Sequence, residues 1–415
     1  MAEYKRKTEL LVPASSLEVL KVAVIFGADA VYIGGDVFGL RAKAKNFTLD
    51  EMREGVEFAH EHGVKVYVTV NILAHNSDLA EADDYLEKLN EVKPDAFIIS
   101  DPGLFAKAKK ICPDIDIHIS TQANNTNYGT YNFWYELGAR RVVSARELSL
   151  EELKEIRGNI PDDLEIETFI HGAMCISYSG RCLLSSYFTG RDANHGECTH
   201  PCRWKYAVVE EERPGVYLPV YENERGTYIF NSKDLCMIEY IPELMSSGID
   251  SFKIEGRMKT ALYVATVART YRKAIDDFNR GKEVYEENLD WYKRQIRSCT
   301  YRQFTTGFFF GKPDETSQIY DSNTYIQEYT YLGVIEGISD EGEAIITQRN
   351  KFLVGDEIEI MKPDGSDVKA KVISIRDESG QYKESAPHPK EKLFVKLDSD
   401  EAKVYDILRV QAKQS

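Results

Sequence analysis

The sequence predicts an α/β fold, a TIM-like (β/α)8 barrel followed by a small antiparallel β-barrel. Two observations lead to this fold class. Between residue 9 and about residue 275, short apolar runs alternate with amphipathic helical stretches. From about residue 325, apolar and polar residues alternate and Gly and Asp-Gly turns interrupt them, which is typical of a small antiparallel barrel or sandwich.

The apolar runs are rich in β-branched and aromatic residues, as expected of strands that are buried on both faces. Helical stretches separate most of them, and the first, SSLEVLKVAVIFG, has a serine N-cap and stops at a glycine. Successive βα units of this kind favour a closed barrel over an open doubly wound sheet. The predicted strands are ELLVPA at 9–14, AVYIGG at 30–35, KVYVTVN at 65–71, AFIISD at 96–101, DIHISTQ at 116–122, RRVVSARE at 140–147, LEIETFIHG at 164–172 and SFKIEGR at 251–257.

The alternation is interrupted after the seventh strand. A cysteine-rich segment at 175–202 follows that strand, and a polar stretch at about 206–227 has the composition of an insertion loop. We therefore predict a barrel domain at 1–310 that carries both segments, and a C-terminal β-barrel domain at 325–415.

The composition is that of a globular protein, with 43% hydrophobic and 29% charged residues. The formal net charge of −16 means that nucleic acid would need a local basic face. The start, MAEYKRKTELLVPASS, lacks the apolar region of a signal peptide, and no apolar run is long enough for a membrane helix. We therefore expect a cytoplasmic protein with no membrane partner, where reduced thiols and an odd count of seven cysteines disfavour disulfides.

Several standard motifs are absent from the sequence. It contains no G-x-x-x-x-G-K-(S/T), no G-x-G-x-x-G, no H-E-x-x-H and no G-x-S-x-G. These absences weaken nucleotide-binding and hydrolase interpretations that depend on such motifs.

Four of the seven cysteines lie in one short segment with the spacing C-x6-C-x15-C-x3-C, namely Cys175, Cys182, Cys198 and Cys202. Clustered cytosolic thiols usually hold a metal, since thiolate sulfur is the soft ligand of zinc and iron–sulfur clusters. The alternative is that a cysteine is only a small buried hydrophobic residue. This is our interpretation of the isolated cysteines Cys112 and Cys299. Structural zinc favours two close pairs and this segment has one, so spacing alone only slightly favours a cluster. Cys236 could replace one ligand.

The stretch ETFIHGAMCISYSGRCLLS at 167–185 resembles the signature of the collagenase-like peptidase family, U-32. That signature is E-x-F-x-x-G-(S/A)-aliphatic-C-x4-G-x-C-x-aliphatic-S, and every position matches. GRDANHGECTHPCRW, NSKDL, SFKIEGRMK and the N-terminal LLVPASSLEVLKVAVIFGADAVYIGG resemble the family's other blocks. The resemblance covers most of the chain.

The resemblance implies two different activities. The family takes its name from collagenase-like peptidases, whereas several of its groups are similar to oxygen-independent RNA and quinone hydroxylases with a 4Fe–4S cluster. The layout resembles the group that converts the wobble uridine of tRNA to 5-hydroxyuridine with prephenate as hydroxyl donor. Carried over, the cluster ligands would be Cys175, Cys182, Cys198 and Cys202, and the fourth is open between Cys202 and Cys236.

Active sites of such barrels form at the C-terminal ends of the strands. Arginine binds carboxylates bidentately, so Arg41, Arg146 and Arg257 suit a dicarboxylate such as prephenate. Surface ion pairs, with Glu147 for Arg146 and with Glu255 for Arg257, explain the latter two equally well. Lys233 and Asp234 form either an acid–base pair or a helix cap. The candidate catalytic residues are Arg41, Asn71, Arg146, His171, Lys233, Asp234, Lys253, Glu255 and Arg257.

A peptidase would need a nucleophile–base pair, and His171, His195 and His200 lie near the cysteines in sequence. These histidines are explained better as surface groups or neighbours of the metal ligands, because no third orienting group is evident. For tRNA, residues 257–302 hold eleven basic and six acidic residues with interleaved aromatics, which suits phosphate contact and base stacking. A solvated helix face has the same composition. An RNA-binding scaffold with a structural metal is therefore a third hypothesis.

Overall fold

The computed structural model describes residues 7–35, 38, 46–174, 178, 182, 184–191, 198–199, 201, 207–209, 217–219, 231–299, 303–311, 318–319 and 328–412. The chain divides into two compact units. The first comprises Met1–Leu17, Asp29–Met258 and Arg302–Thr324, and the second comprises Glu18–Ala28, Lys259–Tyr301 and Tyr325–Ser415. The predicted boundaries, 1–310 and 325–415, are continuous stretches and stay a prediction.

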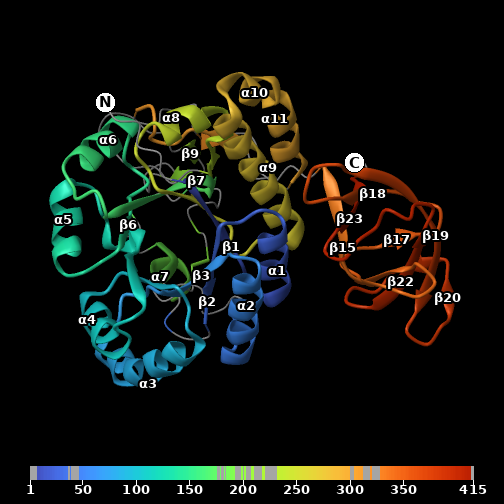
Figure 1. The fold of residues 1–415 in the computed structure, drawn as a ribbon, viewed down its shortest axis with the longest axis horizontal. Coiled ribbons are helices and arrows are strands. Elements are labelled where there is room, and N and C mark those ends of the chain that lie inside the picture. The colour runs from blue at the N-terminus through green and yellow to red at the C-terminus, as the bar shows by residue number, and fades with distance from the viewer. Residues whose placement is uncertain are drawn as a thin grey trace. The chain divides into compact units, whose positions relative to one another are not determined.

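The first unit contains a closed parallel barrel of eight strands, which confirms the predicted fold class (Figure 1). Each strand pairs with the next along the chain, and the last pairs with both the first and the seventh, which closes the barrel. The eight predicted runs each coincide with one of these strands. They are β1 (Glu9–Pro13), β2 (Ala30–Gly34), β3 (Lys65–Val70), β4 (Ala96–Ile99), β5 (Asp116–Ile119), β6 (Arg141–Val143), β7 (Glu165–Ala173) and β12 (Ser251–Ile254).

Amphipathic helices lie around these strands and begin at side-chain caps that the sequence encodes (Figure 1). Thr48 and Glu51 form a capping box, as do Ser149 and Glu152, and each satisfies backbone N–H groups at a helix start. Asp101 caps a third helix, which begins with a proline. The helices of this unit are α2 (Leu49–Glu61), α3 (Asn76–Val92), α4 (Pro102–Ile111), α5 (Tyr128–Glu136), α6 (Leu150–Gly158), α7 (Leu184–Thr189) and α8 (Ile241–Met245), with the 3-10 turns η1 (Thr121–Ala123) and η4 (Ile238–Tyr240).

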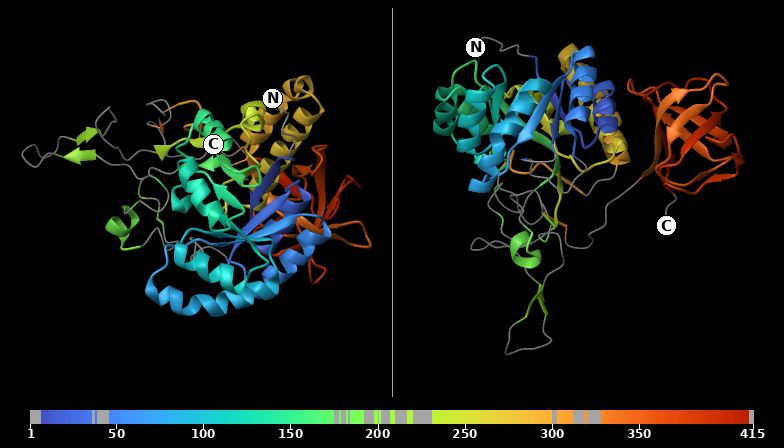
Figure 2. Two further views of the ribbon diagram at one scale, coloured as in Figure 1. Left: turned by 60° about the vertical axis from the view of Figure 1, so that its left-hand side comes forward. Right: turned by 90° about the horizontal axis from the view of Figure 1, so that it is seen from below.

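Short strands extend the barrel sheet beyond the predicted pattern. Strand β11 (Asp234–Cys236) pairs antiparallel with the end of β7, and β13 (Phe304–Thr305) pairs parallel with β11. The predicted insertion loop at about 206–227 contains a two-stranded antiparallel pair, β8 (Ala207–Val209) with β9 (Tyr217–Pro219), which Figure 2 draws as short arrows. A further pair joins β10 (Asn231–Ser232) to β14 (Gln318–Ile319).

The second unit contains a closed antiparallel barrel, which confirms the predicted C-terminal fold. Its six strands run in the order β18-β23-β15-β16-β22-β19, and β18 closes on β19. Aliphatic side chains fill its core, among them Leu332, Ile346, Ile360, Val372 and Leu393. The strands are β15 (Tyr329–Ile338), β16 (Ala344–Thr347), β18 (Glu357–Met361), β19 (Val368–Asp377), β22 (Lys392–Leu397) and β23 (Ile407–Gln411), with the short strands β17 (Phe352–Leu353), β20 (Tyr382–Lys383) and β21 (Ser385–Ala386).

Four helices among the described residues belong to this second unit, and polar contacts join two of them to its barrel. Arg269 on α9 binds the Asp367 carboxylate, and Glu18 on α1 accepts a hydrogen bond from Tyr331. Arg269 is therefore unavailable for RNA contact, and several aromatics of 257–302 are also buried in the core, including Tyr271, Tyr285 and Tyr292. The helices are α1 (Leu17–Ile25), α9 (Ala261–Arg280), α10 (Lys282–Glu287) and α11 (Leu289–Ser298).

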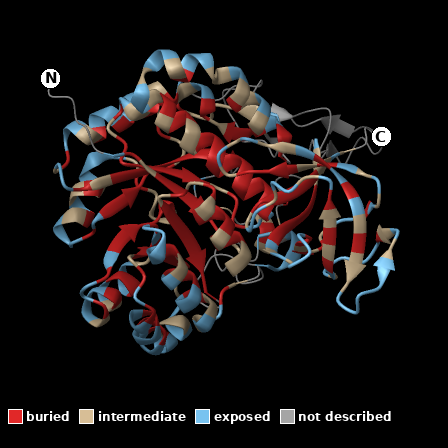
Figure 3. Ribbon diagram, turned by 45° about the vertical axis from the view of Figure 1, so that its right-hand side comes forward, coloured by how far each residue is buried: buried red, intermediate tan, exposed pale blue. Residues whose placement is uncertain are grey.

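Burial follows the strands of the parallel barrel, whereas buried positions alternate with exposed or half-buried ones along strands of the C-terminal barrel (Figure 3). None of the helices that the structure describes is long and apolar enough to cross a membrane.

Candidate active site

Arg257 follows β12 and lies at the C-terminal end of the parallel barrel. Its Nη1 donates to Thr69 Oγ1 at 2.9 Å, and its Nη2 donates to Asn46 Oδ1 at 3.2 Å. The guanidinium crosses the end of β2 at Gly34, where an added Cβ would lie 2.5 Å from Nη1. Glycine is therefore required there so that the arginine can reach β3. Arg257 is buried, so the interpretation as a surface ion pair is wrong.

Two further cations converge on Phe169, which lies on β7. The guanidinium carbon of Arg146 is 4.2 Å from the centre of the Phe169 ring, and the ammonium of Lys253 is 5.3 Å from the same centre. Lys253 also lies 4.5 Å from the ring centre of Tyr32. Aromatic faces attract cations, so the rings hold both positive groups at the barrel mouth. Their convergence creates a site that favours an anionic ligand.

Arg146 keeps hydrogen-bonding capacity in this position. Its Nη1 donates to the Ala173 carbonyl at 3.2 Å, and no described residue accepts from its buried Nε. Among the described residues it forms no ion pair with Glu147. Burial raises the pKa of Glu147, and the Arg146 charge opposes this without cancelling it.

Lys253 is almost fully buried and forms an ion pair with Glu167, whose Oε1 lies 2.6 Å from its Nζ. Burial lowers the pKa of the Lys253 ammonium, and the Glu167 carboxylate opposes this without restoring the ordinary value. The sequence reasoning did not include Tyr32, Glu167 or Phe169 among the site residues. Glu167 and Phe169 are two residues apart on one strand and therefore face the same side, but the sequence does not mark that side as the inner one.

Amide side chains line the ends of β3 and β5. Asn71 Nδ2 donates to Ser120 Oγ at 3.4 Å, and Ser100 Oγ donates to the Asn71 carbonyl at 2.9 Å. Downstream of β5, the side-chain oxygens of Gln122 and Asn124 are buried without a donor among the described residues. These two oxygens are acceptors for a ligand that carries N–H groups.

Strand β11 brings the NSKDL block beside the end of β7. Cys236 is paired opposite His171, and Asp234 is paired opposite Ala173. Asp234 lies in a strand and Lys233 directly precedes it, so the interpretation of this pair as a helix cap is wrong. His171 is buried, and its ring lies 5.8 Å from that of Phe304 on β13.

Glu255 lies directly after β12, beside the end of β7. Its backbone N–H donates to the His171 carbonyl at 2.8 Å. Gly172 has a φ of +111°, and an added Cβ there would lie 2.5 Å from the Glu255 carbonyl oxygen. The backbones of β7 and the segment after β12 therefore approach closely, and this approach fixes Glu255 next to His171.

Two of the four clustered cysteines lie among the described residues. Cys182 is half-buried and Cys198 is exposed. The segments that carry them are joined, because the Thr199 backbone N–H donates to Ser185 Oγ at 3.1 Å and the two hydroxyls lie 3.0 Å apart. This tie holds the segment that carries Cys182 beside the segment that carries Cys198, and thiols are the donor type that a thiolate-bound group requires.

Several other residues that the sequence indicated for the site lie outside the described residues. They are Cys175, Cys202, Arg41, His195 and His200. Within the part of the chain that the structure describes, no three His, Cys, Asp or Glu residues form a metal-holding group.

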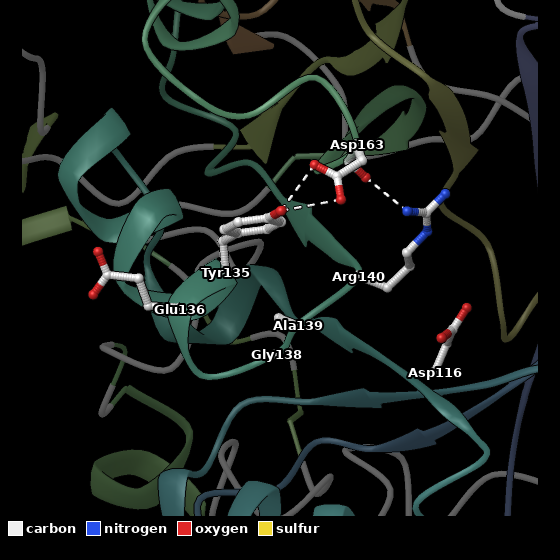
Figure 4. Close-up of a pocket in the computed structure, with 7 residues that line it drawn as sticks. All are labelled: Asp116, Tyr135, Glu136, Gly138, Ala139, Arg140 and Asp163. Carbon is white, nitrogen blue, oxygen red and sulfur yellow. Dashed lines mark hydrogen bonds between the residues drawn. The ribbon is translucent and has the colours of Figure 1, made fainter.

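A hollow of about 430 Å³ lies at the opposite end of the barrel (Figure 4). Asp116 begins β5 and the other lining residues precede β6 or β7, and Tyr135 donates to both Asp163 oxygens at 3.0 Å. Catalytic residues of such barrels lie at the C-terminal ends of strands, so we do not assign the site to this face. The lining residues are Asp116, Tyr135, Glu136, Gly138, Ala139, Arg140 and Asp163.

Comparison with known proteins places this site in a family context. The model of peptidase family U32 matches residues 15–319, and the model of the U32 C-terminal domain matches residues 327–409. These matches confirm the resemblance that the cysteine signature indicated.

Three relatives illustrate the range of names in the family. The tRNA hydroxylation protein P1 of Bacillus subtilis is 41% identical over 95% of this chain and 92% of its own length. An uncharacterized protease of Methanocaldococcus jannaschii is 45% identical over 73% of each chain. A 23S rRNA 5-hydroxycytidine synthase of Escherichia coli is 36% identical over 66% of this chain and 40% of its own. The chain therefore belongs to peptidase family U32.

Proposed function

We propose that the chain is a cytoplasmic tRNA-modifying enzyme that hydroxylates the wobble uridine to 5-hydroxyuridine without oxygen. Prephenate is the proposed hydroxyl donor, and a 4Fe–4S cluster is the proposed cofactor. Relatives named for tRNA hydroxylation and for 5-hydroxycytidine synthesis support hydroxylation of RNA pyrimidines. The site geometry supports an anionic co-substrate.

The convergence of Arg146 and Lys253 on Phe169 is the observation that carries this proposal. Prephenate has two carboxylates, and a pair of cations in one buried site matches two anionic groups. Arg257 adds a third positive group at the same end of the barrel. A peptide substrate of ordinary charge would not supply such a pair of anionic groups.

A flipped uridine suits the amide edge of the same mouth. The N3–H of uracil is a donor, and the oxygens of Gln122 and Asn124 are acceptors without a donor. The Asn124 side-chain nitrogen donates to the Gln122 carbonyl at 3.0 Å, which fixes the orientation of its amide. A fixed acceptor favours a base that presents N–H over one that presents a bare ring nitrogen.

Cys175, Cys182, Cys198 and Cys202 would hold the cluster, with Cys236 as the alternative fourth ligand and zinc as the alternative metal. When bound, an iron–sulfur cluster supplies redox or Lewis-acid chemistry to the hydroxyl donor. The tie between Ser185 and Thr199 supports the shared ligation of Cys182 and Cys198.

Anaerobic purification tests the cofactor. We expect a brown protein whose visible absorbance is lost in Cys182→Ser and kept in Cys112→Ala. Cys112 is the matched control because it is a free, buried cysteine at the C-cap of α4. A colourless protein that holds one zinc ion would contradict the cluster.

Nucleoside analysis tests the reaction. The wild-type chain is expressed in a bacterial strain that lacks 5-hydroxyuridine derivatives, and its tRNA is digested for mass spectrometry. We expect 5-hydroxyuridine derivatives with the wild type and none with Cys182→Ser. If the wild type forms none while it binds tRNA, the chain is an RNA-binding scaffold instead.

The pairing of Cys236 with His171 favours a second candidate, a collagenase-like peptidase. A thiol next to an imidazole is the arrangement that activates a cysteine nucleophile. Gelatin degradation by the wild type, abolished in Cys236→Ala, would support this activity. Its absence in both would remove the candidate.

A further inference from the structure

A chain of buried charges runs through the parallel barrel from the mouth toward its other end. Lys253 Nζ lies 2.6 Å from Glu167 Oε1, and Arg141 Nη1 lies 3.1 Å from Glu167 Oε2. Each oxygen of the Glu167 carboxylate therefore faces one cation. The side chain of Glu167 has an exposed fraction of 0%, so this carboxylate depends on the two cations in place of water.

At the other end of this row of charges, the carboxylates of Glu9 and Glu165 hold Arg141. Its Nη1 and Nη2 donate to the Glu9 oxygens at 2.6 and 3.1 Å, and its Nε donates to Glu165 at 2.8 Å. Tyr67 and Ser251 also donate to Glu9. Arg141 is thus a fixed cation that cannot move away from Glu167.

Stability alone does not explain such a network. Taking charges out of water costs free energy, and replacement of a buried ion pair by apolar side chains is often neutral or stabilising. The C-terminal barrel of the same chain closes around aliphatic side chains. The charges of the parallel barrel therefore call for a functional explanation.

Lys253 connects this network to the mouth. Its ammonium lies between Tyr32 and Phe169 and shares Phe169 with Arg146. The charged and titratable groups around it are Glu167 on β7, Arg141 on β6 and Arg146 after it, Tyr32 on β2 and His118 on β5. Burial and the positive charges of Arg141 and Lys253 hold the pKa of His118 well below its usual range, so the imidazole is neutral at neutral pH. Glu167 is therefore the negative group that supports the charge on Lys253.

We propose that Glu167 is a positioning residue that keeps Lys253 as an ammonium at the floor of the mouth, ready to bind the anionic hydroxyl donor. The hydrogen bond from Arg141 holds the Glu167 carboxylate in place. The identity of the anion rests on the proposed function. The coupling of Glu167 to Lys253 rests on the contacts within the barrel.

The first test measures the charge of Lys253 directly. The protein is labelled with ¹³C at the lysine ε-carbons, and Lys253→Arg identifies the resonance to be followed by NMR over a pH series. In Glu167→Gln we expect Lys253 to lose its proton at a lower pH than in the wild type, because the opposing charge is gone. Glu165→Gln is the matched control, since it removes a carboxylate from Arg141 on the side away from Lys253, and it leaves the titration in place.

The second test measures the consequence for the anion. Prephenate is titrated into the anaerobic holoenzyme, and at neutral pH we expect about tenfold weaker binding in Glu167→Gln, from the loss of one charged hydrogen bond. The binding recovers as the pH falls and Lys253 regains its proton. Glu165→Gln binds like the wild type at every pH. A merely structural role of Glu167 would not produce recovery at low pH.

The outcomes separate this inference from the proposed function. If the Lys253 titration is the same in Glu167→Gln and the wild type, the inference is overturned whatever the tRNA contains. If the titration shifts but the wild type does not bind prephenate, the donor is wrong and the coupling stands. If Glu167→Gln fails to fold, Glu167→Asp is the second variant. Its shorter side chain keeps the negative charge but places it farther from Lys253.

Discussion

The parallel barrel and the C-terminal barrel are both closed sheets, but the first encloses charges and the second encloses aliphatic side chains. Glu167, Arg141 and Lys253 are between 0% and 4% exposed inside the parallel barrel. In the C-terminal barrel, side chains such as Ile346 and Val372 fill the corresponding space. An aliphatic core needs no partners, whereas each buried charge needs one or more. The C-terminal barrel also has buried charges, such as Arg409 and Asp406, but these are not part of its aliphatic core cluster.

Charges serve a different purpose in the second unit. Asp367 binds Arg269 of α9 and Arg409 of β23, so these ion pairs lie between a helix and the barrel strands. They join two elements of one unit and leave the core of the barrel apolar. Charges outside the barrel core join a helix to the barrel in the second unit. Charges inside the parallel barrel lie instead next to the candidate site.

The largest effect is expected from Arg141→Leu. The change leaves Glu9, Glu165 and Glu167 close together without their shared cation, and we expect a loss of about 3–5 kcal/mol in the free energy of unfolding. Hydrogen exchange of the amides of β6 and β7 measures this loss. The neighbouring variant Arg140→Leu removes an exposed pair with Glu165 and an exposed hydrogen bond to the Asp163 carbonyl, so we expect it to cost only about 1–2 kcal/mol. Equal costs for the two variants would contradict the account.

A cavity in the C-terminal barrel gives the contrasting case. Ile346→Ala should cost about 2–4 kcal/mol, through lost apolar contact and the space left behind. Because no charge is involved, the cost is the same at pH 5 and pH 8. Hydrogen exchange of β16 and β22 at both pH values checks this, and a clear pH dependence would argue against an apolar core.

Acidification should weaken the parallel barrel more than the core of the C-terminal barrel. Burial works to raise the pKa of Glu9, but the charge and hydrogen bonds of Arg141 outweigh it, so the pKa lies below its usual value of 4.5. A lowered carboxyl pKa stabilises the fold above the unfolded pKa, and that contribution is lost as pH falls through the folded pKa. Exchange of β1 amides should therefore accelerate below about pH 4.5 in the wild type and less so in Glu9→Gln.

A small effect is expected from Tyr67→Phe. It removes the hydrogen bond from Tyr67 to Glu9 at 2.6 Å and leaves the bonds from Arg141 and Ser251 in place. We expect a loss of about 1–2 kcal/mol, measured by exchange of β3 amides. In the C-terminal barrel, Ile375→Val removes one methylene from the apolar core and should cost about 1 kcal/mol. A cost for Tyr67→Phe well above this range would mean that the remaining donors do not hold Glu9.

The sequence was sufficient to predict both barrels, because strand runs and their periodicity are local signals. It was also sufficient to place Arg146, Lys253 and Arg257 at the mouth, since these residues lie at or beyond the middle of predicted strands. It could not indicate that Glu167 and Arg141 face inward, because strands buried on both faces carry no alternation that marks the inner side.

Long-range pairing is the other limit of sequence reasoning. Glu18 and Tyr331 are 313 residues apart, and their hydrogen bond joins α1 to the C-terminal barrel. No local sequence pattern predicts this contact. The pairing of β11 with β7 likewise places Asp234 in a strand, although a helix cap was one of its two interpretations. Both depend on tertiary contacts that a short sequence window does not contain.

The double variant Glu167→Gln/Lys253→Met tests most directly whether the charged interior serves the site. It replaces the buried ion pair by groups of similar size, and such replacements are often neutral or stabilising by about 1–4 kcal/mol. We predict an unchanged or increased free energy of unfolding, together with loss of 5-hydroxyuridine derivatives from the tRNA of the expressing strain. A variant that is destabilised by about 3 kcal/mol or more and still forms the product would show that the pair exists for stability.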